Sequence, residues 1–193
     1  MDIMDLIKRG GLFFLDSLQT LLIIASVLMI LYAFVIQPNE VSGSSMYPTF
    51  KNKEYLLSYL IDIRLDKYRR GDVIVFHSPV DDEKLFIKRV IGLPGDRIRL
   101  ENGNVYLNGM LFDESSYLAK EVKTYGGSFL PDGVEITVPA GTVFVMGDNR
   151  PYSSDSREWG FLKKSDVVGK SIVRILPLTE FTIIKNPFDS TKK

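Results

Sequence analysis

The chain has 193 residues, with 24 Lys plus Arg, 24 Asp plus Glu, one His and no Cys. The zero net charge gives no electrostatic case for binding nucleic acid. Without cysteine there are no disulfides and no thiolate ligands, and with a single histidine a zinc or iron site is not expected. We therefore predict no cofactor, no metal and no nucleic-acid partner.

An uncharged, apolar stretch runs from Leu18 to Ile36. As a helix it rises ~28 Å at ~1.5 Å per residue, close to the ~30 Å hydrocarbon core of a bilayer. Lys8 and Arg9 precede it, which favours a cytoplasmic N-terminus by the positive-inside rule. We predict a short cytoplasmic segment at residues 1–17, a single transmembrane helix at 18–36 and an extracytoplasmic domain at 37–193, anchored in the cell membrane.

Two other interpretations of this stretch stay open. A buried core helix of a soluble protein can have the same composition. A cleaved secretory signal peptide has a shorter apolar region, of about 7–15 residues. Ser42 and Ser44 could imitate the small residues of a signal cleavage site. The length of the apolar stretch favours the membrane span.

The rest of the chain shows strand patterns rather than helical periodicity. Two Asn-Gly pairs, at 102–103 and 108–109, interrupt alternating apolar residues in the segment 97–112, which predicts hairpins. Further apolar runs of strand length occur at 73–76, 134–138, 142–146 and 171–176. We predict a mostly β fold, an antiparallel sheet or barrel-like domain, with a smaller β-rich excursion at about 97–141.

The stretch VSGSSMYPTF, residues 41–50, contains two adjacent serines, Ser44 and Ser45. A serine nucleophile needs a neighbouring base to accept its proton. The single histidine, His77, directly follows the apolar run 73–76, and a polar residue at the end of a strand is the simpler interpretation of it. Another side chain must be considered as the base.

Lys88 lies in the segment FIKRVIGLPGD, residues 86–96. On a strand, Phe86, Lys88 and Val90 share one face, so the lysine has apolar neighbours on both sides. Burial lowers the pKa of a lysine from ~10.4 toward the ~7–8 that a general base requires. An exposed lysine that extends its amine into water is the alternative, which this segment alone does not exclude.

The segment GDNRPYSSDSREWGF, residues 147–161, follows a predicted strand and is dense in charges and hydroxyls. Taken alone it is typical of a polar loop with internal ion pairs. The same density of charge-assisted hydrogen bonds can also hold one wall of an active site rigid.

Together, these segments resemble the bacterial type I signal peptidases, the leader peptidases. SMYPT preceded by Gly-x-Ser, then RGDVIVF, FIKRVIGLPGD and GDNRPYSSDSREWGF, occur in this order behind the apolar stretch, over roughly residues 18–175. The resemblance implies a serine endopeptidase that uses a Ser-Lys dyad, forms an acyl-enzyme and has a mostly antiparallel β fold.

The resemblance also assigns roles residue by residue. Ser45, directly before Met-x-Pro, matches the nucleophile, and Lys88 matches the general base. Ser153 matches a hydroxyl that orients the lysine. The charged residues that support the site match Asp148, Asp155 and Arg157.

One position departs from part of the family. Some members have a serine two residues before the nucleophile, where its hydroxyl contributes to the oxyanion hole, but this chain has Gly43 there. The oxyanion hole would then depend on backbone N–H groups, and the amide of Ser45 is the first candidate.

The resemblance implies that the substrates are exported preproteins, cut after small residues at the positions one and three before the scissile bond. The partners would then be preproteins and the lipid bilayer. The chain from Ile36 to Ser45 reaches at most ~30 Å when fully extended, so the nucleophile would lie near the membrane that holds the signal peptide.

Two alternatives to this function stay open at the level of sequence. A self-cleaving Ser-Lys protease of the repressor type shares the dyad but is normally soluble. An anchored β domain without activity could act as a receptor or scaffold. A covalent adduct at Ser45 with a serine-directed acylating inhibitor would exclude the scaffold, and absence of self-cleavage would disfavour the repressor type.

Overall fold

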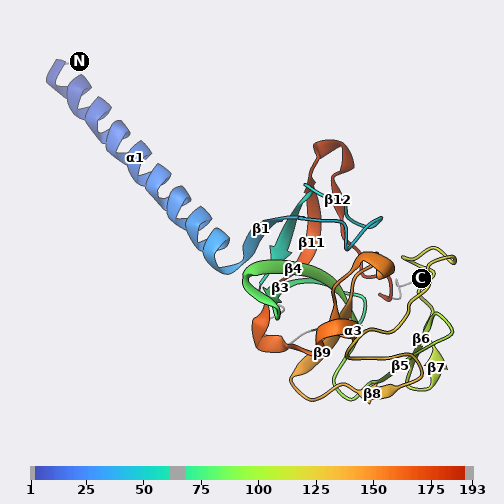
Figure 1. The fold of residues 1–193 in the computed structure, drawn as a ribbon. Helices are drawn as coiled ribbons and strands as arrows, with labels where there is room; N and C mark the ends of the chain where they lie inside the picture. Colours follow the sequence, from blue (N-terminus) through green and yellow to red (C-terminus); the bar gives the residue numbers. More distant parts are fainter. Residues whose placement is uncertain (1–2, 61–67, 190–193) are drawn as a thin grey trace. The chain divides into compact units, whose positions relative to one another are not determined.

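The computed structural model describes residues 3–60 and 68–189. The chain divides into two compact units, Met1–Ile36 and Gln37–Lys193. The first unit is one helix, α1 (Ile3–Phe34) (Figure 1). Its segment Arg9–Tyr32 has a mean hydropathy of 2.1 and is long and apolar enough to cross a membrane, by length and composition. None of this segment is buried, whereas the core helix of a soluble protein would be mostly buried.

The ends of α1 differ from those predicted for the apolar span. The helix begins at Ile3, well before Leu18, because no proline interrupts the residues between them. It ends at Phe34, and Ile36 already belongs to strand β1 (Ile36–Glu40). Pro38 explains this end, because proline lacks an N–H and disfavours the helical conformation in the residue before it.

The second unit is built on an antiparallel sheet. Its described strands follow the order β1-β2-β11-β3-β4-β9-β10, with β12 paired to β11, and the pairs from β2 to β10 are antiparallel. The mostly β, antiparallel fold predicted from the sequence is therefore confirmed. The strands after β1 are β2 (Tyr55–Tyr59), β3 (Val73–Ser78), β4 (Asp81–Gly92), β9 (Thr142–Met146), β10 (Leu162–Lys163), β11 (Val167–Leu176) and β12 (Thr182–Ile183).

Short helical turns connect some of these strands. They are η1 (Arg150–Tyr152), α3 (Ser156–Trp159), η2 (Lys164–Asp166) and η3 (Leu178–Glu180). The first two lie between β9 and β10, within the charge-rich segment that the sequence singled out.

A smaller sheet is inserted between β4 and β9, where the excursion was predicted (Figure 1). Its order is β7-β6-β5-β8, with bounds β5 (Arg97–Glu101), β6 (Asn104–Leu107), β7 (Met110–Leu111) and β8 (Glu135–Thr137). Both Asn-Gly pairs form the predicted hairpin turns, because asparagine and glycine tolerate the left-handed conformation best. Their φ values are 53° at Asn102, 74° at Gly103, 54° at Asn108 and 82° at Gly109.

Two apolar clusters position the later site. One joins the two sheets and consists of Ile91, Ile98, Leu100, Val105, Leu107, Leu130, Val138, Phe144 and Met146. Because this cluster draws on β4 and β9 as well as on β5 and β6, the excursion packs against the strand that contains Lys88. The other cluster underlies the turn of Ser45 and consists of Val41, Met46, Phe50, Leu56, Val73, Val75 and Ile87.

Candidate active site

Ser45 lies in the turn that connects β1 to β2. The amide of Tyr47 donates to the carbonyl of Ser44 at 3.0 Å, and the amide of Phe50 donates to the carbonyl of Met46 at 2.9 Å. Met46 and Phe50 are buried in the core, while Ser45 itself is half-buried. The turn is thus held in place by core side chains that follow the serine, and the Ser45 hydroxyl remains accessible.

Lys88 approaches Ser45 from the middle of β4. Its backbone pairs with Ile74 on β3, and only 3% of the residue is exposed. Its Nζ lies 2.8 Å from Oγ of Ser45 and 3.0 Å from the carbonyl oxygen of Ile87. The alternative of an exposed lysine is therefore wrong, and the two predicted partners are in contact.

The environment of Lys88 suits a base. Burial lowers the pKa of Lys88 to about 8, and the negative charges of Asp155 and Asp148 partly oppose this lowering. A base works best when its pKa lies near the working pH, because it is then both available and strong. A neutral amine at this place can accept the proton of Ser45 without any histidine.

Asp148 connects three parts of the site. Its carboxylate accepts hydrogen bonds from Arg89, with Nε to Oδ1 at 2.9 Å and Nη2 to Oδ2 at 2.6 Å. It also accepts one from Oγ1 of Thr49 at 2.6 Å. Arg89 follows Lys88 on β4, and Thr49 belongs to the turn of Ser45. One buried carboxylate therefore ties the turn, the lysine strand and the loop after β9 to one another.

Asp155 joins the beginning of the loop after β9 to its end. Its carboxylate accepts two hydrogen bonds from the guanidinium of Arg157, at 2.8 and 2.9 Å, and one from the amide of Gly147 at 3.0 Å. It also caps α3, because the amide of Arg157 donates to Oδ1. Nη2 of Arg157 in turn donates to the carbonyl of Arg150 at 2.7 Å. The predicted supporting residues thus make the beginning and the end of this loop one rigid piece.

Two further residues of this loop contact the turn of Ser45 and were not predicted. The amide of Asn149 donates to the carbonyl of Ser45 at 3.0 Å, and its Nδ2 donates to the carbonyl of Ser44 at 2.9 Å. A Cβ placed on Gly147 would overlap with the Ser45 carbonyl oxygen and with Oγ of Ser153. The sequence signals Asn149 and Gly147 only by their position inside the GDNR stretch. Contacts with backbone atoms of a distant segment leave no pattern in the sequence.

Ser153 lies beside the dyad but is not hydrogen-bonded to it. Its Oγ is buried and has no hydrogen-bond partner among the described residues. The hydroxyl lies against Gly147, which in turn lies against the carbonyl of Ser45. The role of Ser153 in orienting Lys88 stays a prediction.

A backbone group is available for the oxyanion. Within the described parts of the chain, the amide of Ser45 donates no hydrogen bond. Gly43 has a φ of 94° and its amide donates to Oδ1 of Asn52 at 2.8 Å. A Cβ on Gly43 would meet nothing within 4 Å, so the space beside the turn is open.

His77 makes no hydrogen bond to Ser45 or Lys88 in the described structure. His77 lies near the end of β3, paired with Leu85, and its side chain is exposed. Across residues 3–60 and 68–189, no group of three or more His, Asp or Glu side chains could hold a metal ion.

A groove of about 270 Å³ opens at Ser45 and Lys88. It lies between residues 40–46, from the last residue of the edge strand β1 onward, and residues 85–88 of β4, with Tyr152 and Ser154 at its border. Among the described strands, this half of β4 pairs with β3 alone, because β9 pairs only from Arg89 onward. A larger cavity, of about 720 Å³, is lined by residues of the loop after β9 and of the segment 118–126, but by neither Ser45 nor Lys88.

The domain is mostly β, and in it a serine contacts a buried lysine beside a groove. This arrangement is typical of one class of protein, the serine peptidases. Residues 14–176 match the family model described as "Signal peptidase, peptidase S26". The chain therefore belongs to the signal peptidase family, peptidase S26. This membership favours an enzyme over the anchored scaffold that the sequence alone left open.

Individual relatives agree with this membership. The chain is similar to signal peptidase IB of Staphylococcus aureus (strain MRSA252), with 33% identity over 177 residues, covering 86% of this chain and 91% of that protein. It is also 38% identical over 151 residues to a probable signal peptidase I-2 of Synechocystis sp., covering 75% of this chain and 65% of that protein. A crystal structure of a signal peptidase I from Enterococcus faecalis V583 has 34% identity, a TM-score of 0.45, and coverage of 54% of this chain and 96% of that one.

Proposed function

We propose that this protein is a membrane-anchored signal peptidase that removes N-terminal signal peptides from exported preproteins, with Ser45 as the nucleophile and Lys88 as the general base. The observation that carries the proposal is the 2.8 Å contact between Oγ of Ser45 and Nζ of the buried Lys88. Ser-Lys pairs are one of the recurring variants of serine-protease chemistry.

Acylation follows from this contact. Neutral Lys88 takes the proton of Ser45 while Oγ attacks the carbonyl carbon of the scissile peptide bond. The negative charge that develops on the carbonyl oxygen is stabilised by the free amide of Ser45. When the C–N bond breaks, the ammonium of Lys88 returns its proton to the departing amine, which is the new N-terminus of the mature protein. The signal peptide remains as an ester on Ser45.

Deacylation repeats these roles with water. Lys88, again neutral, takes a proton from a water molecule that attacks the ester, and then donates it to Oγ of Ser45 as the ester bond breaks. The signal peptide leaves with a free carboxylate. Asp148 and Asp155 remain paired with their arginines throughout and hold the geometry.

The groove supports the proposed substrate. Its border at residues 85–88 is unpaired on one side, so an extended peptide can add there as a strand through main-chain hydrogen bonds. Its volume of about 270 Å³ is just below the ~300–1,000 Å³ of typical ligand pockets. We expect small side chains next to the scissile bond, as the resemblance to signal peptidases implies.

The anchor supports the same function. We propose that α1 spans the membrane once through its apolar part from Leu18 onward, with residues 1–17 on the cytoplasmic side and residues 37–193 on the outer side. Lys8 and Arg9 before the span support this orientation. A substrate held in the same bilayer by its own apolar segment then has a raised effective concentration at the site.

Cleavage of a synthetic preprotein by the detergent-solubilised full-length protein tests the function directly. With Ala at the positions one and three before the scissile bond, we expect a single cut directly after the second Ala, identified from the product masses. A matched substrate with Phe at the position before the bond should react at least ~100-fold more slowly, because the family that the chain resembles cuts after small residues at this position. Equal cleavage of both substrates, or cuts at other positions, would refute the proposed specificity.

The pH dependence of kcat/KM should report Lys88. The base must be neutral, so activity should be present above the Lys88 pKa of about 8 and should be lost as the pH falls through it. At pH 7 roughly one tenth of the free enzyme carries a neutral lysine, so kcat/KM should rise about tenfold per pH unit below the pKa and level off above it. A profile that stays flat between pH 6 and 9 would contradict a lysine base.

A further inference from the structure

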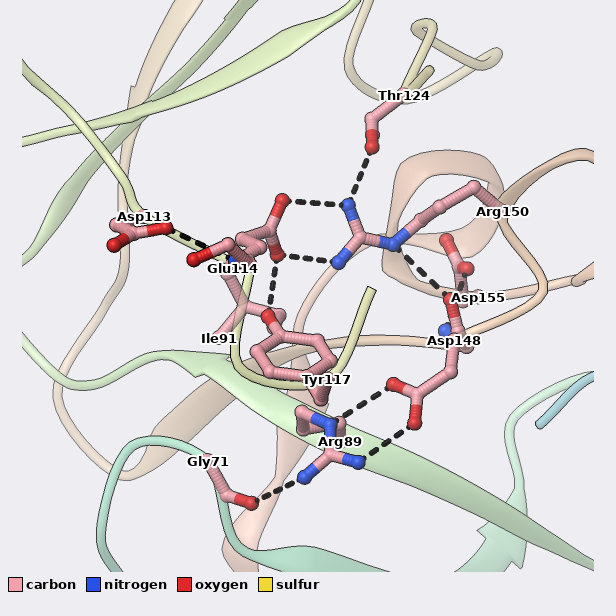
Figure 2. A network of polar contacts seen from close by, with 12 residues as sticks. Gly71, Arg89, Ile91, Asp113, Glu114, Tyr117, Thr124, Asp148, Arg150 and Asp155 are labelled. Carbon is pink, nitrogen blue, oxygen red and sulfur yellow. Dashed lines mark hydrogen bonds and ion pairs between the residues drawn. The ribbon is translucent and has the colours of Figure 1, made fainter. Parts of the chain in front are cut away.

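We propose that Glu114, in the inserted excursion, is a positioning residue of the active site that acts through Arg150 and, together with Tyr117, through Arg89. The inference rests on the proposed function and assigns a task to a part of the chain that contains neither the nucleophile nor the base. Figure 2 shows these side chains between the excursion and the loop after β9.

The first link runs from Glu114 through Arg150 to the loop. The side chain of Arg150 is fully buried, and both of its terminal nitrogens donate to the two carboxylate oxygens of Glu114. Nη1 also contacts Oγ1 of Thr124, while Nε donates to the carbonyl of Gly147 at 3.1 Å. A buried guanidinium needs an opposite charge, and Glu114 is the carboxylate that pairs with it in the described structure. Through Arg150, Glu114 therefore holds Gly147, which lies against the carbonyl of Ser45.

The second link runs from Glu114 through Tyr117 to β4. The hydroxyl of Tyr117 donates to Oε1 of Glu114 at 2.5 Å. Burial, and then the negative charge of Glu114, raise the pKa of Tyr117, so this hydroxyl stays protonated. The guanidinium of Arg89 lies over the Tyr117 ring, 4.3 Å from its centre, and donates twice to Asp148 (Figure 2). The excursion therefore also positions Arg89, which follows Lys88, and Asp148, whose carboxylate Arg89 binds.

The backbone of the excursion adds a third contact to the same loop. Nη1 of Arg157 donates to the carbonyl of Tyr125 at 3.1 Å. The amides of Phe129 and Leu130 both donate to the carbonyl of Arg157, at 2.9 and 3.0 Å. The excursion thus also contacts the loop that touches the Ser45 turn through backbone atoms, and Glu114 lies at the point where the two side-chain links meet.

The test compares Glu114→Gln with the matched change Glu135→Gln in the full-length protein. Glu135 lies on the same excursion but pairs with Arg97 at an exposed site, 3.3 Å away. At a temperature where each variant is fully folded, we expect Glu114→Gln to lower kcat at least ~10-fold with KM within about twofold, because the loop shifts the Ser45 turn while the border of the groove at residues 85–88 is unchanged. Glu135→Gln should change neither constant by more than about twofold.

Hydrogen exchange gives a second readout that needs no substrate. In Glu114→Gln the amides of residues 147–157 should exchange faster than in the wild type, whereas those of β3 should not change. A role in overall stability alone would instead raise exchange throughout the domain and leave the kcat of the folded enzyme unchanged, which would overturn the inference. If the wild type cleaves no preprotein, the proposed function fails, and exchange alone still decides the role of Glu114.

Two milder variants cover the case in which Glu114→Gln does not fold. Tyr117→Phe removes only the hydroxyl that donates to Glu114, and Thr124→Val removes only the oxygen that contacts Arg150. Each should lower kcat about threefold and speed exchange within residues 147–157. If both variants match the wild type in kcat and in local exchange, Glu114 does not position this site.

Discussion

Lys88→Ala should abolish cleavage of the preprotein, with kcat at least ~10⁴-fold below the wild type, because no other described side chain lies within hydrogen-bond distance of Oγ of Ser45. Ser45→Ala should have the same effect, and the double variant should be no worse than either single one, since the two groups act as a unit. Lys88→Arg should also be inactive, because a guanidinium stays protonated and cannot accept a proton. Initial rates with the solubilised enzymes, measured near pH 9, check all four variants.

His77→Ala is the control for this result. The side chain of His77 is exposed on β3, and the substitution should leave at least about half of the activity. Circular dichroism and thermal unfolding establish that each variant is folded. An inactive but folded His77→Ala enzyme, or an active Lys88→Ala enzyme, would refute the assignment of lysine as the base.

Gly147→Ala should lower kcat/KM by at least ~100-fold, although it removes no functional group. The added methyl group would overlap with the carbonyl oxygen of Ser45 and with Oγ of Ser153, and would lie 2.6 Å from Cβ of Ser153. The Ser45 oxygen belongs to the backbone of the turn, so it cannot move aside without moving the nucleophile. Overpacking of this kind also costs about 1–3 kcal/mol of stability. Steady-state kinetics and thermal unfolding measure the two effects separately.

Gly11→Ala provides a matched control for this substitution. A Cβ on Gly11, in α1, meets nothing within 4 Å, so the variant should keep its activity within about twofold. A folded Gly147→Ala enzyme with activity close to the wild type would show that the Ser45 turn and the loop after β9 can separate without loss of function.

Much of the fold was predictable because the signals are local. Each Asn-Gly pair sets a hairpin through the backbone conformation of two residues, and the apolar runs of β3 and β9 need only the period of a strand. The extent of α1 was predicted less well. Its apolar core was evident, but where it ends was decided by Pro38, and its first turns contain charged residues that a search for apolar stretches passes over.

Part of the candidate site was also predictable from the sequence, and part of it was not. Ser45 and Lys88 were found from the resemblance of short segments to a family, and the structure places them in contact across a separation of 43 residues. Asn149 and Gly147 were missed because both contact backbone atoms of the distant Ser45 turn, and such contacts leave no pattern in the sequence. Glu114 was missed because its partner, Arg150, lies 36 residues away and an acidic residue in a loop is normally exposed.

By itself, the sequence determined the class of the fold, the apolar helix and the candidates for the reacting residues, because each of these depends on residue types within a short segment. Only the tertiary structure decided that Lys88 is buried, because its alternating neighbours were compatible with an exposed face as well. Burial is what lowers the pKa of the lysine to about 8, and it arises where the turn of Ser45 and the loop after β9 meet β4. The same packing decides which carboxylate each buried arginine binds, since charge pairing between distant segments leaves no local pattern in the chain.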